Sequence, residues 1–577
     1  MRTHYPRTPH LPWSPGATSD DVRVVDLSVL AGREVVVTEK LDGENTTLYA
    51  DGLHARSLDS VHHPSRGWVK ALQGRVGSRI PAGWRICGEN VFARHSIPYD
   101  RLDGFFYGFS VWDGDRCLGW DRTTAFLREL GIPVPPVLWR GAFDPRAEKA
   151  LRGLTLDTGR QEGYVVRPAG AFGAEEFGRA VAKWVRPGHV TTGTHWMHAA
   201  VVPNTLGPSA ALWNVRSGGA VDAEGLGEAL ALPVPHDAAP EDAAPPSGAA
   251  HPPDARTAVA MGAAAGATGS GAFGDERLDG VLAGLLHRDR RSGIAPRLAP
   301  VLGMSQAVRV ADLVGLHRSL HRPYPDEERR TGLTRMSWAA GLPALHALAA
   351  ATAPTPAARE QVAWSALHAE EVREPAGLRE VFDGLEPDAA DRCRAQAREA
   401  YARGRITTAD EAVPATWRWR SGEFPRLVLL CGPSGSGKST YARALPGVST
   451  YIALDDLREA RGDRADQSAN AEVVREAVER LERALLPGST TVWDATSLTP
   501  GQRSLVHGVA RGRDALVTHV AALVDTAELA RRNATRTHPV PPPVQEAQAR
   551  RYVPPYPGEA HRTWYLGASG TVEARAV

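Results

Sequence analysis

The sequence predicts a multidomain protein that combines an α+β part, a helical part and an α/β part with a parallel sheet. Three observations lead to this fold class. The chain has 577 residues, more than one hydrophobic core usually holds. Short strand-like runs dominate its first part and helical periodicity its middle, while a buried strand before a glycine-rich loop opens its last part. The 57 glycines and 44 prolines also indicate a linker.

The charge balance and the cysteines limit the classes of function. The chain has 67 Lys and Arg residues against 66 Asp and Glu residues, which excludes a uniformly basic nucleic-acid coat but leaves room for a basic cleft. Its four cysteines form no CxxC pair, so we expect neither a disulfide framework nor a cysteine-rich zinc site. The opening residues lack the apolar core of a signal peptide, and no run of about 18 apolar residues occurs. We therefore expect a soluble, cytoplasmic protein without a membrane partner.

The chain divides into four segments. Residues 1–235 alternate strand-like runs with turns, which predicts a β-rich domain. Residues 236–272 are rich in Ala, Pro and Gly and lack periodic apolar positions, which predicts a flexible linker. Residues 273–416 carry apolar residues at a spacing of three to four, which predicts a helical domain. Residues 417–577 begin with a buried strand and form the predicted α/β domain.

The last segment carries a phosphate-binding loop. Residues 432–439 read GPSGSGKS and match GxxxxGK[ST], with a strand-like run before them and a helix-forming run after them. Glycines let backbone N–H groups face phosphate oxygens, a lysine reaches the outer phosphates, and a serine hydroxyl can ligate Mg²⁺. The predicted nucleotide-binding residues are Gly432, Gly435, Gly437, Lys438, Ser439 and Thr440.

Charged residues follow the later strands of this segment. Asp455 and Arg458 come after one strand-like run, and Arg532 and Arg536 lie four apart on one face of a predicted helix. A base and cations are what phosphoryl transfer requires. The segment resembles the 5′-hydroxyl polynucleotide kinase branch of the P-loop kinases. The resemblance implies that Asp455 is the general base, that Arg458 binds the acceptor phosphate and that Arg532 and Arg536 are lid arginines. A small-metabolite kinase remains an alternative.

A lysine motif opens an ordered series in residues 1–235. Lys40, Asp42, Gly43 and Asn45 lie in the sequence TEKLDGEN, and Arg56, Glu89, Phe109, Glu162, Lys183 and Arg186 follow in that order. The series resembles the motifs of covalent nucleotidyltransferases, the polynucleotide ligases and mRNA capping enzymes. The resemblance implies an ATP-grasp-like ligase fold in which Lys40 attacks the α-phosphorus of ATP. Asn45 lies five residues after Lys40. The chain resembles RNA ligases of the phage dsRNA-sealing type in having Asn at this position.

The residue types suit this chemistry. A lysine attacks only as the neutral amine, and we expect burial and the cations Lys183 and Arg186 to lower the pKa of Lys40. Glu89 is suited to ribose contact and Glu162 to Mg²⁺, for which Mn²⁺ is an alternative. Phe109 would stack on adenine, although an aromatic residue on a strand is more often a core residue.

The helical segment contains scattered histidines. His317 and His321 share a helical face without a carboxylate at matching spacing, so we expect exposed or core histidines and not metal ligands. The segment is predicted to be a helical spacer, with the basic, aromatic-containing run at residues 317–330 as a candidate RNA-contact surface.

Taken together, the motifs predict an ATP-dependent RNA end-healing and sealing enzyme. The kinase phosphorylates 5′-hydroxyl ends, and the ligase joins the resulting 5′-phosphates to 3′-hydroxyl ends through a lysyl-AMP intermediate. The implied partners are the ends of nicked or broken RNA, tRNA included, and a separate phosphatase for 3′-ends; the sequence does not indicate an oligomeric state. Two alternatives remain: a nucleotidyltransferase fused to a small-molecule kinase, and a non-catalytic, nucleotide-gated RNA-binding protein.

Overall fold

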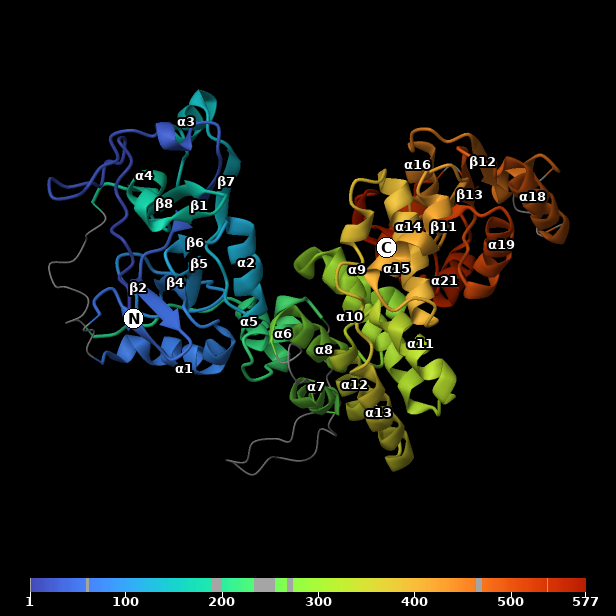
Figure 1. Ribbon diagram of the computed structural model, residues 1–577, viewed down its shortest axis with the longest axis horizontal. Helices are drawn as coiled ribbons and strands as arrows, with labels where there is room; N and C mark the ends of the chain where they lie inside the picture. The colour runs from blue at the N-terminus through green and yellow to red at the C-terminus, as the bar shows by residue number, and fades with distance from the viewer. Residues whose placement is uncertain are drawn as a thin grey trace. The chain divides into compact units, whose positions relative to one another are not determined.

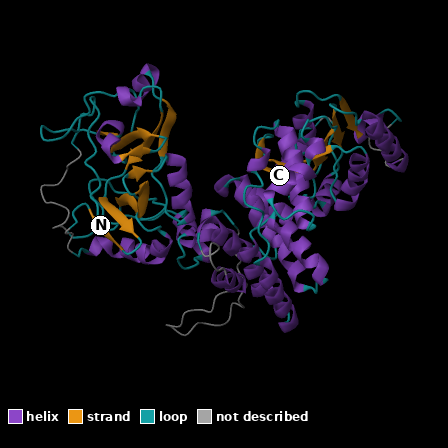
Figure 2. Ribbon diagram, viewed as in Figure 1, coloured by secondary structure: helices purple, strands orange, loops and turns teal. Residues whose placement is uncertain are grey.

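The computed structural model describes residues 2–58, 62–188, 200–232, 255–266, 273–462, 470–536 and 538–577 (Figure 1). The chain forms two compact units, residues 1–238 with 269–278 and residues 239–268 with 279–577. Strands are concentrated in the first and last parts of the chain, and helices fill its middle (Figure 2). The predicted fold class is thus confirmed. Among the described residues, no helix is both long and apolar enough to cross a bilayer.

The first unit is built on two antiparallel sheets. The four-stranded sheet has the order β10 (Ala182–Val185), β8 (Gly163–Pro168), β1 (Glu34–Lys40) and β7 (Val137–Ala142). The six-stranded sheet has the order β3 (Gly52–Ala55), β2 (Glu44–Tyr49), β4 (Trp84–Asn90), β5 (Phe106–Asp113), β6 (Arg116–Cys117) and β9 (Phe172–Gly173). Three consecutive valines of β1 are fully buried, so this strand is covered on both faces.

Short helices cover the sheets of the first unit. They are α1 (Gly67–Val76), α2 (Trp120–Glu129), α3 (Pro145–Arg152), α4 (Phe177–Ala180), α5 (Ala210–Arg216) and α6 (Ala223–Ala229). Leu72 of α1 and Leu127 of α2 pack against Leu48, Ile86 and Phe106 of the six-stranded sheet. This core fixes β2, which carries the end of the lysine motif.

The second unit contains the predicted parallel sheet. Its order is β12 (Thr450–Ala453), β13 (Thr490–Asp494), β11 (Arg426–Cys431), β14 (Leu516–Ala522), β15 (Arg562–Leu566) and β16 (Val572–Ala576). All neighbouring strands are parallel except β15 and β16. The helices of this α/β part are α16 (Lys438–Arg443), α17 (Leu454–Glu459), α18 (Asn470–Ala484), α19 (Pro500–Gly512), α20 (Thr526–Ala534) and α21 (Pro542–Arg551).

The middle of the chain is helical, as predicted. Its helices are α7 (Ala255–Gly266), α8 (Gly274–Leu285), α9 (Arg291–Leu302), α10 (Met304–Leu316), α11 (Asp326–Ser337), α12 (Leu342–Thr352), α13 (Pro356–Ala369), α14 (Pro387–Ala402) and α15 (Ala409–Ala415). Those from α9 onward lie in the same compact unit as the parallel sheet. Asp388 and Arg392 of α14 make ion pairs of 2.7 and 2.8 Å with Arg562 and Asp514 of the α/β part. Two largely buried arginines, Arg392 and Arg562, thus join the predicted helical spacer to the α/β part through ion pairs with partly exposed carboxylates.

Helix α7 lies inside the stretch predicted as a flexible linker. Its alanine-rich sequence has high helix propensity, and Ala260 and Ala263 are buried. Gly284 of α8 permits a close approach, since a Cβ at this position would lie 2.7 Å from the Cα atom of Ala260. Small side chains thus let a helix pack where composition alone indicates a linker. Residues 236–254 and 267–272 of the predicted linker lie outside the described residues.

The four cysteines, Cys87, Cys117, Cys393 and Cys431, are free and buried. Burial raises the pKa of each thiol above its usual value. The absence of a disulfide framework therefore agrees with the sequence prediction.

Candidate active sites

Lys40 lies at the end of β1, where three carboxylates surround it. Its ammonium group donates a hydrogen bond to the carboxylate of Glu162, the residue before β8. Glu89 of β4 and Asp42 also act on its charge. The strand register explains this arrangement, because Lys40 pairs with Gly163 and Asn45 of β2 pairs with Glu89. The structure thus brings residues from three separate motifs together.

The pKa of Lys40 corrects one expectation from the sequence. Burial lowers it, but the nearby charges of Glu162 and Glu89 outweigh burial and raise the pKa of Lys40 above its ordinary value. The pKa of Glu89 is itself raised to about 8, mainly by burial. We expected burial and cations to lower the pKa of Lys40, but the carboxylates Glu162 and Glu89 raise it.

The loop after Lys40 is fixed by backbone contacts. A carboxylate oxygen of Asp42 accepts hydrogen bonds from the backbone N–H groups of Ser96 at 2.7 Å and Ile97 at 3.1 Å. Gly43 lies so close to β4 that a Cβ would be 2.5 Å from the carbonyl oxygen of Asn90. These contacts explain why the sequence has Asp and Gly here, and they hold the loop rigidly next to the lysine.

The N-terminal segment 9–16 extends the four-stranded sheet beside Lys183. The backbone N–H of Lys183 donates to the carbonyl of Pro9 at 2.9 Å, and that of Leu11 donates to the carbonyl of Lys183 at 2.7 Å. Burial, and next the charge of Lys40, lower the pKa of Lys183. The backbone N–H of Arg186 donates to the carbonyl of Glu162 at 3.0 Å, and Arg56 is exposed just after β3. The sequence patterns did not predict that segment 9–16 pairs with β10.

Phe109 of β5 is half-buried in an aromatic cluster. Its ring packs edge-on against Tyr5 with centroids 5.2 Å apart, and the guanidinium of Arg167 lies 5.6 Å from its centre. Tyr5 and Arg167 were not predicted as site residues. Tyr5 lies in the opening segment and Arg167 lies five residues after Glu162, but single residues of these types carry no spacing signal.

The phosphate-binding loop connects β11 to α16, as predicted. Gly435 and Gly437 have φ values of +86° and +85°, a conformation that glycine adopts without strain. Lys438 is buried, and its ammonium donates to the carbonyl of Pro433 at 3.5 Å. Burial lowers the pKa of Lys438, while Asp494 and Asp455 oppose this effect. The loop is therefore preformed around an inward-facing cation.

A cavity of about 1130 Å³ opens from this loop. Its lining contains every predicted site residue of the second unit except Gly432. The lining also includes Asp494, Gln548, Arg443 and Arg551. Binding sites for one small molecule usually have volumes of about 300–1,000 Å³, so this cavity has room for a nucleotide and part of a second ligand.

Asp455 and Arg458 lie in the first turns of α17 and face one another. The guanidinium of Arg458 donates to Asp455 at 2.7 Å and to the side-chain oxygen of Asn470 at 2.8 Å. The side chain of Asp455 remains half-exposed toward the cavity, and that of Arg458 is largely buried. A carboxylate and a cation are thus held side by side.

The two predicted lid arginines differ in their surroundings. Arg532 lies on α20, where it donates to Glu528 at 2.6 Å and to the carbonyl of Ser436 in the phosphate-binding loop at 3.5 Å. Arg536 lies beyond the end of α20 and is exposed, so the two do not share one helical face as predicted. The helix ends at Ala534, yet both arginines line the cavity.

Oxygen ligands for a hard cation occur in both units. Ser439 and Asp494 line the same cavity, and Glu162 and Glu89 lie around Lys40. Mg²⁺ and Mn²⁺ favour such ligands, and Mg²⁺ usually completes its shell with water and phosphate oxygens. In the described part of the chain, no three His, Cys, Asp or Glu side chains form a metal site by themselves. The oxygen ligands of each unit fit Mg²⁺ or Mn²⁺.

Fold and sites define the class of protein: a unit of two antiparallel sheets with a lysine among carboxylates, in one chain with a P-loop unit. Residues 33–185 match the RNA ligase family, and residues 427–555 match the AAA domain family. The chain therefore carries an RNA ligase domain near its N-terminus and a P-loop kinase-like domain near its C-terminus, as the resemblance implied.

Solved structures of both kinds resemble parts of the chain. An RNA ligase of Naegleria gruberi with ATP and Mn is 19% identical over 28% of this chain and 51% of that chain, with a TM-score of 0.21. Kti12 of Chaetomium thermophilum with ADP-AlF3 is 19% identical over 24% of this chain and 88% of that chain, with a TM-score of 0.21. An archaeal ATP-dependent RNA ligase is 17% identical over 32% of this chain and 48% of that chain, with a TM-score of 0.23. The chain spans about half the length of these ligases. A search of curated proteins finds no match.

Proposed function

We propose that this protein heals and seals RNA ends with ATP. The P-loop unit phosphorylates a 5′-hydroxyl end, and the nucleotidyltransferase unit joins the 5′-phosphate to a 3′-hydroxyl end. The observation that carries the proposal is the grouping of Lys40, Glu162, Glu89 and Asp42 in a domain that matches the RNA ligase family. The second unit makes the substrate that the first unit consumes.

In the ligase unit, Lys40 is the nucleophile. The amine nitrogen attacks the α-phosphorus of ATP, a nitrogen–phosphorus bond forms, the bond to the bridging oxygen breaks, and pyrophosphate leaves. Glu162 already accepts a hydrogen bond from Lys40 and is therefore placed to receive its proton. Lys183 and Arg186 would stabilise the triphosphate, and Glu89 and Asn45 would contact the ribose. A bound Mg²⁺ would supply positive charge at the phosphates.

In the kinase unit, the cavity holds both reactants. Backbone N–H groups of the loop and Lys438 would bind the ATP phosphates, with Ser439 and Asp494 as the metal ligands. Asp455 would accept the proton of the attacking 5′-hydroxyl, and Arg458, next to it, would bind the acceptor phosphate. Arg532 and Arg536 would stabilise charge on the transferred phosphoryl group. The pair of Asp455 and Arg458 in the lining of a large cavity favours a polynucleotide acceptor.

Two labelling experiments test the proposal. Incubation with [α-³²P]ATP and Mg²⁺ should label the protein covalently, and Lys40→Ala should abolish the label while Lys70→Ala, an exposed lysine of α1, retains it. Absence of label in the wild type would refute the ligase function.

Transfer of γ-³²P from ATP to a 5′-hydroxyl oligoribonucleotide tests the kinase. Lys438→Ala and Asp455→Ala should lose this transfer, and Glu482→Gln, an exposed carboxylate of α18 outside the cavity, should retain it. Adenylylation of Lys40 without phosphate transfer to any RNA or DNA end would favour a small-molecule kinase in the second unit.

A further inference from the structure

A short segment after α21, residues 552–556, is attached to the phosphate-binding core at two points. We call this segment the strap; its sequence is YVPPY. The hydroxyl of Tyr552 donates to the carbonyl of Cys431, the last residue of β11, at 3.2 Å. The backbone N–H of Val553 donates to the carbonyl of Leu498 at 2.9 Å. The strap therefore lies against the strand before the phosphate-binding loop and the loop after β13.

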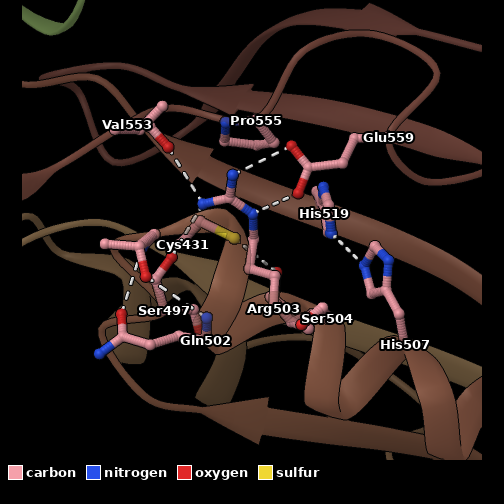
Figure 3. Close-up of polar contacts among 12 residues, drawn as sticks. Cys431, Ser497, Gln502, Arg503, Ser504, His507, His519, Val553, Pro555 and Glu559 are labelled. Atoms are coloured by element: carbon pink, nitrogen blue, oxygen red, sulfur yellow. Dashed lines mark hydrogen bonds and ion pairs between the residues drawn. The ribbon is translucent and has the colours of Figure 1, made fainter.

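Arg503 of α19 holds the strap from one side. Its side chain is fully buried and forms a bidentate ion pair with Glu559, with N–O distances of 2.5 and 3.0 Å (Figure 3). Its guanidinium also donates hydrogen bonds to the carbonyls of Val553 at 3.0 Å and Ser497 at 3.1 Å. Ser497 lines the cavity and has a φ of +42°, which is uncommon for a residue other than glycine. Arg503 thus stabilises a strained residue of the cavity wall.

Arg291 of α9, in the helical part, holds the strap from the other side. It donates to the carbonyls of Pro554 and, at 3.1 Å, Pro555, and to the buried carboxylate of Asp312 of α10 at 2.8 Å. Its guanidinium lies 3.4 Å from the ring centre of Tyr556. Three consecutive strap carbonyls thus accept hydrogen bonds from the buried Arg503 and the largely buried Arg291, each neutralised by its own carboxylate.

The strap begins directly after α21, and α21 contacts the phosphate-binding loop. The side-chain oxygen of Gln548 accepts a hydrogen bond from the backbone N–H of Ser434 at 2.9 Å. Gln545 donates to the carbonyls of Ser434 at 3.2 Å and of Leu529 in α20 at 2.9 Å. An unbroken series of contacts therefore runs from the helical part through the strap and α21 to the loop.

We propose that Arg291 and Asp312 of the helical part, with Arg503 and Glu559, are positioning residues of the nucleotide site. The helical part would then be a working component of the P-loop unit. Without the two arginines, the strap carbonyls lose their donors, and α21 loses the anchor that places Gln548 on the phosphate-binding loop. The phosphotransfer readout rests on the proposed kinase function, whereas the nucleotide-binding readout does not.

The variants must separate positioning from folding. Removal of Arg291 alone would leave the fully buried Asp312 without a countercharge, which destabilises strongly, whereas replacing both partners of a buried pair by apolar residues is often tolerated. The test variant is therefore Arg291→Met with Asp312→Leu in the full chain. The matched control is Arg335→Met with Glu399→Leu, a pair between α11 and α14 in which Arg335 is exposed and Glu399 is half-buried.

The measurement is the Kd for fluorescent mant-ADP with Mg²⁺, together with the melting temperature and the label on Lys40. We expect the double variant to raise the Kd at least tenfold, to raise the KM for ATP, and to leave labelling of Lys40 unchanged. The control variant should keep the wild-type Kd. A folded double variant whose Kd stays within twofold of wild type would overturn the inference.

A second variant covers the case in which the double variant does not fold. Arg291→Lys keeps the charge next to Asp312 but lacks the forked donor set that reaches both proline carbonyls. We expect a several-fold increase in the Kd for mant-ADP, and an unchanged Kd would overturn the inference. If the wild type binds mant-ADP but phosphorylates no 5′-hydroxyl end, the proposed kinase function fails and the inference is still tested.

Discussion

Replacement of Gly163 by alanine should disable the nucleotidyltransferase unit. Gly163 follows Glu162 at the start of β8, between Lys40 on β1 and Val185 on β10. A Cβ on this residue would lie 1.9 Å from the carbonyl oxygen of Trp184. Real Cβ atoms essentially never come closer than 3.0 Å to another heavy atom, so the two strands must separate by about 1.1 Å.

That displacement acts on both sides of the site. It moves Glu162 relative to Lys40, and it moves β10, which carries Lys183. Misplacement of reacting groups by about 1 Å costs about 10²-fold in rate, and overpacking costs about 1–3 kcal/mol of stability. We therefore expect Gly163→Ala to be folded but to form the lysyl-AMP adduct about a hundred times more slowly.

The assay is a time course of labelling with [α-³²P]ATP under saturating ATP, beside a thermal melt. The control is Gly178→Ala in α4, where a Cβ would have no neighbour within 4 Å. It should label at the wild-type rate. Wild-type labelling by Gly163→Ala would show that the spacing of β8 and β10 does not set the geometry of the site.

Three further predictions concern charge, burial and backbone. The pKa of Lys40 is raised, so at every pH below it the neutral amine becomes about tenfold more abundant with each pH unit. The initial labelling rate should therefore rise about tenfold per pH unit between about pH 6 and pH 9. A labelling rate that does not change with pH would contradict this prediction. Arg66→Met leaves the buried Glu44 without its countercharge and should lower the free energy of unfolding, measured by urea titration, by about 3–5 kcal/mol. The control Arg160→Met removes an exposed ion pair with Asp100 and should change the free energy of unfolding by less than about 1 kcal/mol. Gly437→Ala, at a φ of +85°, should weaken mant-ADP binding, and Gly447→Ala, also left-handed but outside the cavity, should not.

Motifs with fixed spacing were predictable from the sequence. The phosphate-binding loop, its flanking strand and helix, and the lysine motif are local patterns whose chemistry restricts each residue type. The order of the later motifs, read with the resemblance to ligases, predicted Glu89 and Glu162 as site residues, and in the structure both lie near Lys40. Sequence alone did not show that these carboxylates dominate the pKa of Lys40, because that balance depends on distances in three dimensions.

Long-range contacts were not predictable in the same way. Segment 9–16 contacts β10 through Ser14 and Val185, which are 171 residues apart in the chain. Arg291 contacts the strap at Pro554, which is 263 residues away in the chain. Buried arginines look like surface residues in a sequence, so their partners cannot be inferred from periodicity. The sequence therefore predicted only a helical spacer, and the ion pairs that join the helical part to the α/β part were found in the structure.

The buried thiols give the molecule an internal reporter of opening. Cys87 and Cys117 belong to the first compact unit, and Cys393 and Cys431 to the second. Since only an exposed thiolate reacts quickly with an alkylating reagent, each cysteine becomes modified only when the structure around it opens. Peptide mapping of the modified cysteines would therefore measure the local opening of the first unit and of the second unit separately, in one sample and without any introduced label.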